Sequence, residues 1–118
     1  MKANVDYDSE YDILYIYPKD RDTKVDFSID HDDIILDVKG NKIIGVELMD
    51  ASEKFVSDEE STERMKKVLA SIKDAFISVK YEINSIRVKI GFYSEIPEPT
   101  REGLLIQIPI ERELMVEV

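Results

Sequence analysis

The sequence predicts an α+β fold in which a mostly antiparallel sheet of eight or nine strands packs with one amphipathic helix. Three observations predict it: short apolar segments alternate with turn residues, one helical repeat of apolar residues follows Ser57, and no apolar run is long enough to cross a membrane. A chain of 118 residues can bury one core but not two. We therefore expect a single domain over 1–118, with a five-stranded segment at 1–52, a helix within 53–76, and a hairpin and further strands at 77–118.

The first two predicted strands cover residues 3–7 and 12–17 and are joined by the four residues 8–11. This connection would place Val5 opposite Leu14 on one apolar face. The other face of the second strand carries Ile13, Tyr15 and Tyr17, so that strand is apolar on both sides. Such a pattern is typical of a strand that is central in its sheet or covered.

Three further strands are predicted at residues 25–29, 34–38 and 43–49, the first of them half-buried because its apolar residues alternate with polar ones. The last two would be joined by a three-residue loop that ends in Gly40, with positive φ at the glycine. An odd loop length keeps the two apolar stripes on one face. These stripes are Ile34, Leu36 and Val38, and Ile44, Val46 and Leu48.

Residues 7–16, Y-D-S-E-Y-D-I-L-Y-I, and residues 43–52, I-I-G-V-E-L-M-D-A-S, resemble the small prokaryotic family known as domain of unknown function 2283. That family has a Y-D turn, an aspartate shortly before L-Y-I, and a glycine turn that leads to G-I-E-I-L-x-A-S. Tyr11 stands where the family usually has a small residue, and Val46 replaces an isoleucine. The resemblance covers under half of the chain and implies no known activity. The positions that fit are Tyr7, Asp8, Asp12, Leu14, Tyr15, Ile16, Gly40, Gly45, Glu47, Ala51 and Ser52.

The second half of the chain predicts a helix and then a hairpin. Ser57 and Glu60 have the spacing of a capping box, and apolar residues from Met65 onward recur at helical intervals, which predicts a helix of about 58–74. Asn84-Ser85 then predicts a two-residue hairpin. Its eight apolar residues would share one face: Ile77, Val79, Tyr81, Ile83, Ile86, Val88, Ile90 and Phe92.

The last predicted strands follow a loop rich in proline and charge. Leu104–Ile110 forms a further strand in which Pro109 indicates a sheet edge or a strand end, because proline cannot donate to a ladder. Residues 115–118 are expected to add a short terminal strand. Exposed edges can be satisfied by pairing two copies of the chain, so a homodimer is a further hypothesis.

The charge of −10 is confined to the first half of the chain. Residues up to Ser61 include 17 acidic and 7 basic side chains, whereas the remainder has 9 of each. An acidic surface repels phosphate backbones and attracts basic partners, so nucleic acid is not an expected partner. The absence of cysteine excludes disulfides, thiolate catalysis and Cys-based zinc sites. The N-terminus has no apolar signal core, and we expect a cytoplasmic protein without a membrane partner.

The acidic turn Asp30-His31-Asp32-Asp33, with Asp37 nearby, is the candidate cation site. Carboxylates with one imidazole could bind a divalent metal, whereas the structural alternative is a polar reversal whose carboxylates satisfy backbone groups. His31 is the only histidine, and the chain has neither a G-x-S-x-G elbow nor a glycine-rich phosphate loop. We therefore predict no catalytic residues and no cofactor. Asp8 and Asp12 flank the first turn, where they could order a ligand or simply form the turn.

Ile13 and the tyrosines at positions 11, 15 and 17 are the candidate interaction surface. They could pack inside the protein, contact another protein, or stack nucleic-acid bases, and the acidic neighbours count against the last reading. The sequence thus predicts a small, acidic, non-enzymatic domain that binds a basic protein, for example as an antitoxin neutralises a basic partner. The alternative is a small-ligand or metal-binding domain that uses Asp30–Asp33.

Overall fold

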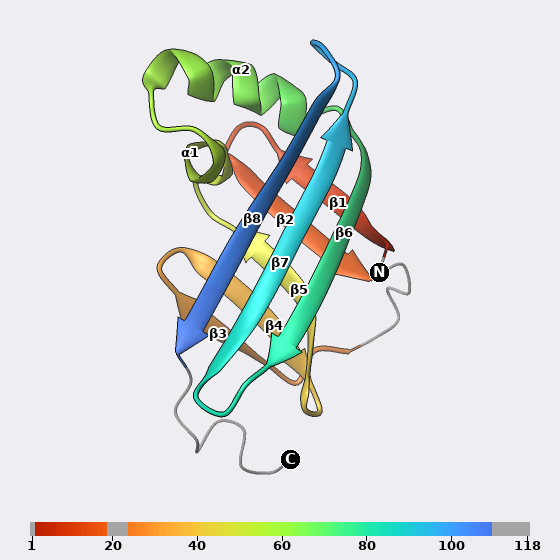
Figure 1. Ribbon diagram of the computed structural model, residues 1–118, viewed down its shortest axis with the longest axis vertical. Helices are drawn as coiled ribbons and strands as arrows, with labels where there is room; N and C mark the ends of the chain where they lie inside the picture. The colour runs from red at the N-terminus through yellow and green to blue at the C-terminus, as the bar shows by residue number, and fades with distance from the viewer. Residues whose placement is uncertain (1, 19–23, 110–118) are drawn as a thin grey trace.

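The computed structural model describes residues 2–18 and 24–109, and its strands form one antiparallel sheet of eight strands in the order β3-β4-β5-β2-β1-β6-β7-β8 (Figure 1). The predicted mostly antiparallel α+β class is confirmed. The loop predicted at 19–23 and the strand predicted at 115–118 lie outside the described residues. The elements are β1 Lys2–Asp8, β2 Ile13–Pro18, β3 Phe27–His31, β4 Ile34–Lys39, β5 Lys42–Leu48, α1 Ala51–Phe55, α2 Glu59–Leu69, β6 Ile72–Tyr81, β7 Ser85–Ser94 and β8 Thr100–Pro109.

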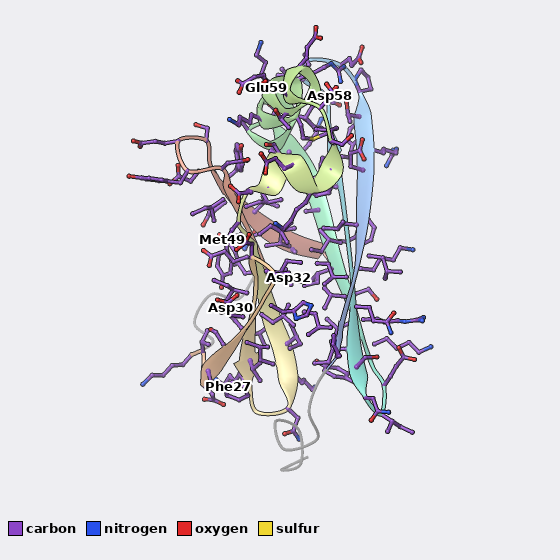
Figure 2. All side chains as sticks on the ribbon, turned by 90° about the vertical axis from the view of Figure 1, so that its left-hand side faces the viewer. Phe27, Asp30, Asp32, Met49, Asp58 and Glu59 are labelled. Carbon is purple, nitrogen blue, oxygen red and sulfur yellow. The ribbon has the colours of Figure 1, made fainter. Side chains whose placement is uncertain are left out.

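The sheet folds into two layers at the contact between β1 and β6. These strands pair only through Lys2 with Phe76 and Ala3 with Ala75, so the sheet is narrow there and can bend sharply. β6–β8, the C-terminal layer, cross in front of β1–β5, the N-terminal layer, and Figure 2 shows the two layers edge-on. The core lies between them.

The core consists of inward-facing aliphatic and aromatic side chains of both layers and of the helix α2. Each fully buried aliphatic side chain stabilises the fold by about 1.5–3 kcal/mol. β2 contributes from the middle of the sheet, which confirms the prediction that this strand is central or covered. The members of the core with the least exposure are Leu14, Ile16, Leu36, Val38, Val46, Leu48, Val68, Leu69, Ile86, Val88, Ile90 and Ile108.

Two helices, rather than the single predicted one, close one end of the two layers (Figure 1). α1 was not predicted, because five residues are too few to show a helical repeat. α2 starts one residue later than the capping box implied, since the Asp58 side chain accepts the Ser61 N–H at 2.8 Å. It also ends earlier, at Leu69: from Ile72 onward the chain is the strand β6, in which burial alternates with period two.

The β1–β2 hairpin has a register that differs from the predicted one. Val5 pairs with Ile16, not with Leu14, because the four-residue turn is Ser9–Asp12 rather than residues 8–11. Asp12 is the reason for the shift. Its φ of 56° places it in the left-handed region, which aspartate tolerates better than most residues, and it therefore belongs to the turn.

The β4–β5 connection is also shorter than predicted. Lys39 pairs with Lys42, so the loop has two residues, with Gly40 at a φ of 59° as expected. The apolar residues of β4 and β5 still share one face, because β5 contains one extra residue. That residue forms a bulge opposite Asp37 and Val38. Ile43 rather than Ile44 therefore faces the core.

The β6–β7 hairpin pairs Tyr81 with Ile86, and the Glu82 N–H donates to the Ser85 carbonyl at 2.9 Å, so the chain turns at Ile83-Asn84, one residue earlier than the predicted Asn84-Ser85. Ile83 consequently leaves the predicted apolar face and is 90% exposed at the tip. Among the described strands β8 lies at the sheet edge, as Pro109 predicted, and it begins at Thr100 rather than at Leu104; Ile110, the last residue of the predicted strand, lies outside the described residues. None of the helices in the described part of the chain combines the length and apolar character that crossing a bilayer requires.

Candidate functional site

Asp12 joins the first hairpin to the start of α1. Its carboxylate accepts hydrogen bonds from the Ser52 N–H at 3.1 Å, the Ser52 hydroxyl at 2.6 Å and the Tyr7 hydroxyl at 2.7 Å. Its carbonyl accepts the Ala51 N–H at 2.9 Å. Asp50, the residue that precedes α1, makes no side-chain cap, so Asp12 satisfies the helix start from a distant part of the chain.

The residues of this junction bond mainly to one another. Ser52 is 1% exposed, and its hydroxyl proton is already donated to Asp12. The phenol of Tyr7 has a raised pKa, because it is partly buried and donates to the same carboxylate. Tyr7, Asp12, Ala51 and Ser52 are therefore motif residues that hold the N-terminal layer to the helices.

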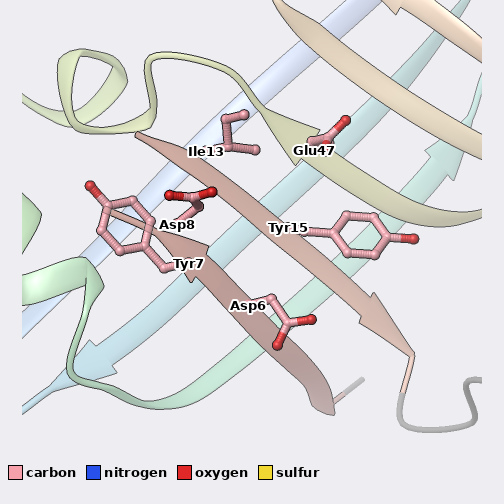
Figure 3. Close-up of a pocket in the computed structure, with 6 residues that line it drawn as sticks. All are labelled: Asp6, Tyr7, Asp8, Ile13, Tyr15 and Glu47. Carbon is pink, nitrogen blue, oxygen red and sulfur yellow. The ribbon is translucent and has the colours of Figure 1, made fainter. Parts of the chain in front are cut away.

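Beside this junction, the outer face of the N-terminal layer carries an open hollow of about 290 Å³, the acidic hollow (Figure 3). Three of its six lining residues carry a carboxylate. The apolar side chains on this face are those of Ile13 and Tyr15; Tyr7 borders the hollow, but it pairs with Leu14 and its side chain packs against the core. The lining residues are Asp6, Tyr7, Asp8, Ile13, Tyr15 and Glu47.

Cross-strand pairing explains why these side chains meet. Tyr15 on β2 pairs with Asp6 on β1 and with Glu47 on β5, so a carboxylate lies on each side of its ring. Asp8 pairs with Ile13 in the same way, one step along the hairpin. Residues directly opposite one another in an antiparallel sheet lie about 5 Å apart at Cβ and share one face, so the pairing alone builds the hollow.

The Tyr15 ring is held in place by the next strands. Its hydroxyl donates to Asp37 Oδ2 at 2.6 Å, and it crosses Gly45, where an added Cβ would come within 2.9 Å of the phenolic oxygen. Tyr17 stacks on the other side, with ring centroids 4.9 Å apart. Because its position is fixed before any partner arrives, Tyr15 would lose little conformational entropy on binding.

The predicted interaction surface is only partly assembled. Ile13 and Tyr15 line the acidic hollow, but Tyr17, which stacks beside Tyr15 on β2, is only 7% exposed and is not part of the lining. Tyr11 is 67% exposed and lies in the β1–β2 turn, outside the lining. The carboxylates Asp6 and Glu47 were not predicted to take part. Their positions opposite Tyr15 would have revealed them if the register had been known.

The turn from Asp30 to Asp33 is a tight hairpin in which Asp32 and Asp33 have φ values of 48° and 63°. Left-handed backbone at both positions matches a two-residue primed turn, for which aspartate is well suited. His31 Nε2 lies 3.3 Å from Asp32 Oδ2, a contact between neighbours on an exposed turn. Over residues 2–18 and 24–109, no three histidine or carboxylate side chains converge as a metal ion would require.

Asp30 and Asp37, the other candidates for the cation site, point elsewhere. Asp30 pairs with Ile35, and Ile35 pairs with Glu47. Asp30 therefore lies on the same outer face as the acidic hollow, but two strands away from Glu47. Two strand spacings are about 10 Å, too far for a shared metal ion. Asp37 is engaged by the hydroxyls of Tyr15 and Ser28.

The described fold and site define an α+β protein with an acidic outer face and a fixed tyrosine at its centre. Residues 4–52 match the family model described as "Protein of unknown function (DUF2283)", which covers β1–β5 and the start of α1, while the C-terminal half lies outside the match. No curated protein and no solved structure matches the chain. The matched region is thus the layer that carries the acidic hollow.

Proposed function

We propose that the N-terminal layer is a protein-interaction module whose acidic hollow receives a basic side chain of a partner protein. The observation that carries the proposal is Tyr15, fixed between Asp6 and Glu47 on an open face. A guanidinium or ammonium group placed there would contact carboxylates at its edges and an aromatic ring beneath it.

The charge of the surroundings favours the same kind of partner. Residues up to Ser61 carry 17 acidic and 7 basic side chains, and a field of this sign attracts cationic proteins and accelerates their association. Individual exposed ion pairs contribute only about 0.2–1 kcal/mol. Affinity would therefore come from several weak charge contacts around one desolvated cation on Tyr15, and it would fall as salt is added. Neutralisation of a small basic protein, as an antitoxin performs, is one form of this function.

The direct test is the binding of a fluorescent arginine-rich peptide, followed by anisotropy at low and high salt, together with a pull-down from cell lysate at the same two salt concentrations. Reversal of the charge in Glu47→Lys should lower peptide affinity about tenfold at low salt. Tyr15→Leu should weaken binding without changing the charge.

Glu60→Lys is the matched control, because Glu60 is an exposed acid on α2 and the substitution changes the net charge equally. Equal losses for Glu47→Lys and Glu60→Lys would show that only net charge matters and would reject the hollow as the site. Failure to retain any protein or peptide at either salt concentration would reject the function itself.

A further inference from the structure

The outer face of the C-terminal layer has the opposite charge from the N-terminal layer. Alternation along β6–β8 points one set of side chains away from the core, and pairing aligns them in rows across the three strands. This set, the basic face, has four cations and one carboxylate. Its members are Asp74, Phe76, Ser78, Lys80, Arg87, Lys89, Gly91, Tyr93, Arg101, Gly103, Leu105 and Gln107.

The centre of the basic face is aromatic and otherwise bare. Phe76 pairs with Gly91, which pairs with Gly103, so one complete row has a single side chain. The Phe76 ring lies over Gly91, where an added Cβ would come within 2.2 Å of the ring. Phe76 is nevertheless 43% exposed, and its ring can therefore be reached from solvent.

The cations around this ring are largely available for binding. Among the described residues, neither Lys80 nor Lys89 forms an ion pair, and both are exposed. Arg101 lies over the Tyr93 ring, 4.6 Å from its centroid, and forms no ion pair with another described residue. Arg87 alone is paired, with Glu82 Oε1 at 2.9 Å from its Nε.

We propose that the basic face binds single-stranded RNA, with a base stacked on Phe76 and phosphates held by Lys80, Lys89 and Arg101. An exposed aromatic ring on a sheet, flanked by lysine and arginine, combines the two interactions by which unpaired strands are bound: base stacking and neutralisation of phosphates. Ser78 and Gln107 stand in the same rows as the two lysines and supply hydrogen-bonding groups for the ribose 2′-hydroxyl.

The net charge of −10 does not oppose this assignment, because the excess carboxylates belong to the other layer. The two inner faces pack against each other around one core, so the two outer faces point in opposite directions (Figure 2). Charges on the two outer faces are separated by more than the roughly 10 Å spacing of packed sheets, and the salt solution that surrounds both faces screens exposed charges over about 8 Å. The acids on the N-terminal layer are therefore largely screened from a strand bound to the basic face.

A protein with an acidic surface is the competing occupant, and Phe76 argues against it. Carboxylates would use Lys80, Lys89 and Arg101 but would gain nothing from the exposed Phe76 ring, whereas a base stacks on it. This inference is independent of the function proposed for the acidic hollow, since the two sites have no residue in common.

The test is titration of the full chain into a fluorescent single-stranded RNA of roughly ten nucleotides, followed by anisotropy. Binding should weaken with salt, with a log–log slope of roughly −2 to −3 for three or four phosphate contacts. Phe76→Ala should lower affinity at least about fivefold. Lys89→Gln should reduce the magnitude of the slope by about 0.7.

Two matched variants serve as controls: Lys67→Gln removes an exposed lysine on α2, and Ile83→Ala truncates an exposed apolar residue at the β6–β7 turn. Neither should change RNA binding. Thermal unfolding of every variant establishes that the variant is folded. If Phe76→Ala does not fold, Lys89→Gln still tests the site, because this substitution leaves Phe76 in place.

Three results would overturn the proposal. One is the absence of RNA binding at low salt. Another is equal competition by polyglutamate together with no effect of Phe76→Ala, which would indicate an acidic protein as the occupant. The third is equal or tighter binding of the DNA strand of the same sequence or of duplex RNA, which would remove the assignment to single-stranded RNA.

Discussion

The Ser52 hydroxyl donates a 2.6 Å hydrogen bond to Asp12 Oδ2, and this pair joins two positions that are forty residues apart in the chain. The bond connects the β1–β2 turn to the first turn of α1. It places the helices at one end of the layers and fixes the turn beside the acidic hollow. It also gives a structural role to two residues of the sequence pattern, Asp12 and Ser52.

Replacement of Asp12 by asparagine should destabilise the protein by about 1–3 kcal/mol. The carboxylate accepts from Ser52 and Tyr7 with both oxygens, whereas an amide has one acceptor and would direct an N–H group at a donor. Chemical denaturation measures the change. Asp50→Asn is the matched control, because Asp50 also has a left-handed φ of 49° but makes no side-chain cap. Equal losses for both variants would reject the role of the carboxylate.

Stability should decline at alkaline pH in a way that depends on Tyr7. The folded state raises the pKa of this phenol, so above pH 10, the ordinary pKa, the unfolded chain loses a proton that the folded chain keeps. Fewer protons on the unfolded state mean that the free energy of unfolding falls as pH rises. The slope above pH 10 should be shallower in Tyr7→Phe, as measured by denaturation at a series of pH values. Parallel slopes for the two proteins would contradict this.

Gly45→Ala should destabilise the N-terminal layer by about 1–2 kcal/mol, because the new Cβ would lie 2.9 Å from the Tyr15 hydroxyl and displace it from Asp37. The same change at Gly103 should be near neutral, since the nearest atom to its Cβ would be 3.6 Å away. Thermal unfolding distinguishes the two. In a Tyr15→Phe background the cost at Gly45 should shrink, and full additivity would contradict the contact.

Asp58→Ala should lower the melting temperature, whereas Ser57→Ala should leave it nearly unchanged, because the Asp58 side chain accepts the Ser61 N–H. Hydrogen bonds to Ser61 lower the pKa of this carboxyl below 3.8, so its contribution is present above that pH and is lost as pH falls through the lowered value. A melting temperature that drops only in Ser57→Ala would show instead that Ser57 is the helix cap, as the sequence suggested.

The elements of the fold were largely predictable because their signals are local. Alternating apolar residues identified the strands, Pro109 indicated the edge strand, and the apolar repeat around Met65 and Val68 identified α2. Registers were predicted less well. The error in the first hairpin came from Asp12, whose left-handed backbone places it in the turn and whose carboxylate contacts Ser52 far along the chain.

The candidate site could be predicted only in part. Ile13 and Tyr15 were identified from their place on an apolar strand, but Asp6 and Glu47 join them only through pairing across three strands. A count of charges along the sequence could not predict the basic face, because the acidic and basic residues from Thr62 onward are equal in number. Alternation in β6–β8 separates their cations onto one side, while Glu63 lies on α2 and Glu95 and Glu98 lie in the β7–β8 loop.

The sequence by itself determined the α+β class, the strands and the longer helix, and the acidic character of the first half, because propensity, periodicity and charge are properties of neighbouring residues. Only the tertiary structure decided that the sheet folds into two layers, that Tyr15 stands between two carboxylates, and that four cations share a face with Phe76. Those relationships depend on which strands pair and in what register, and pairing is settled by the burial of one common core rather than by any single segment.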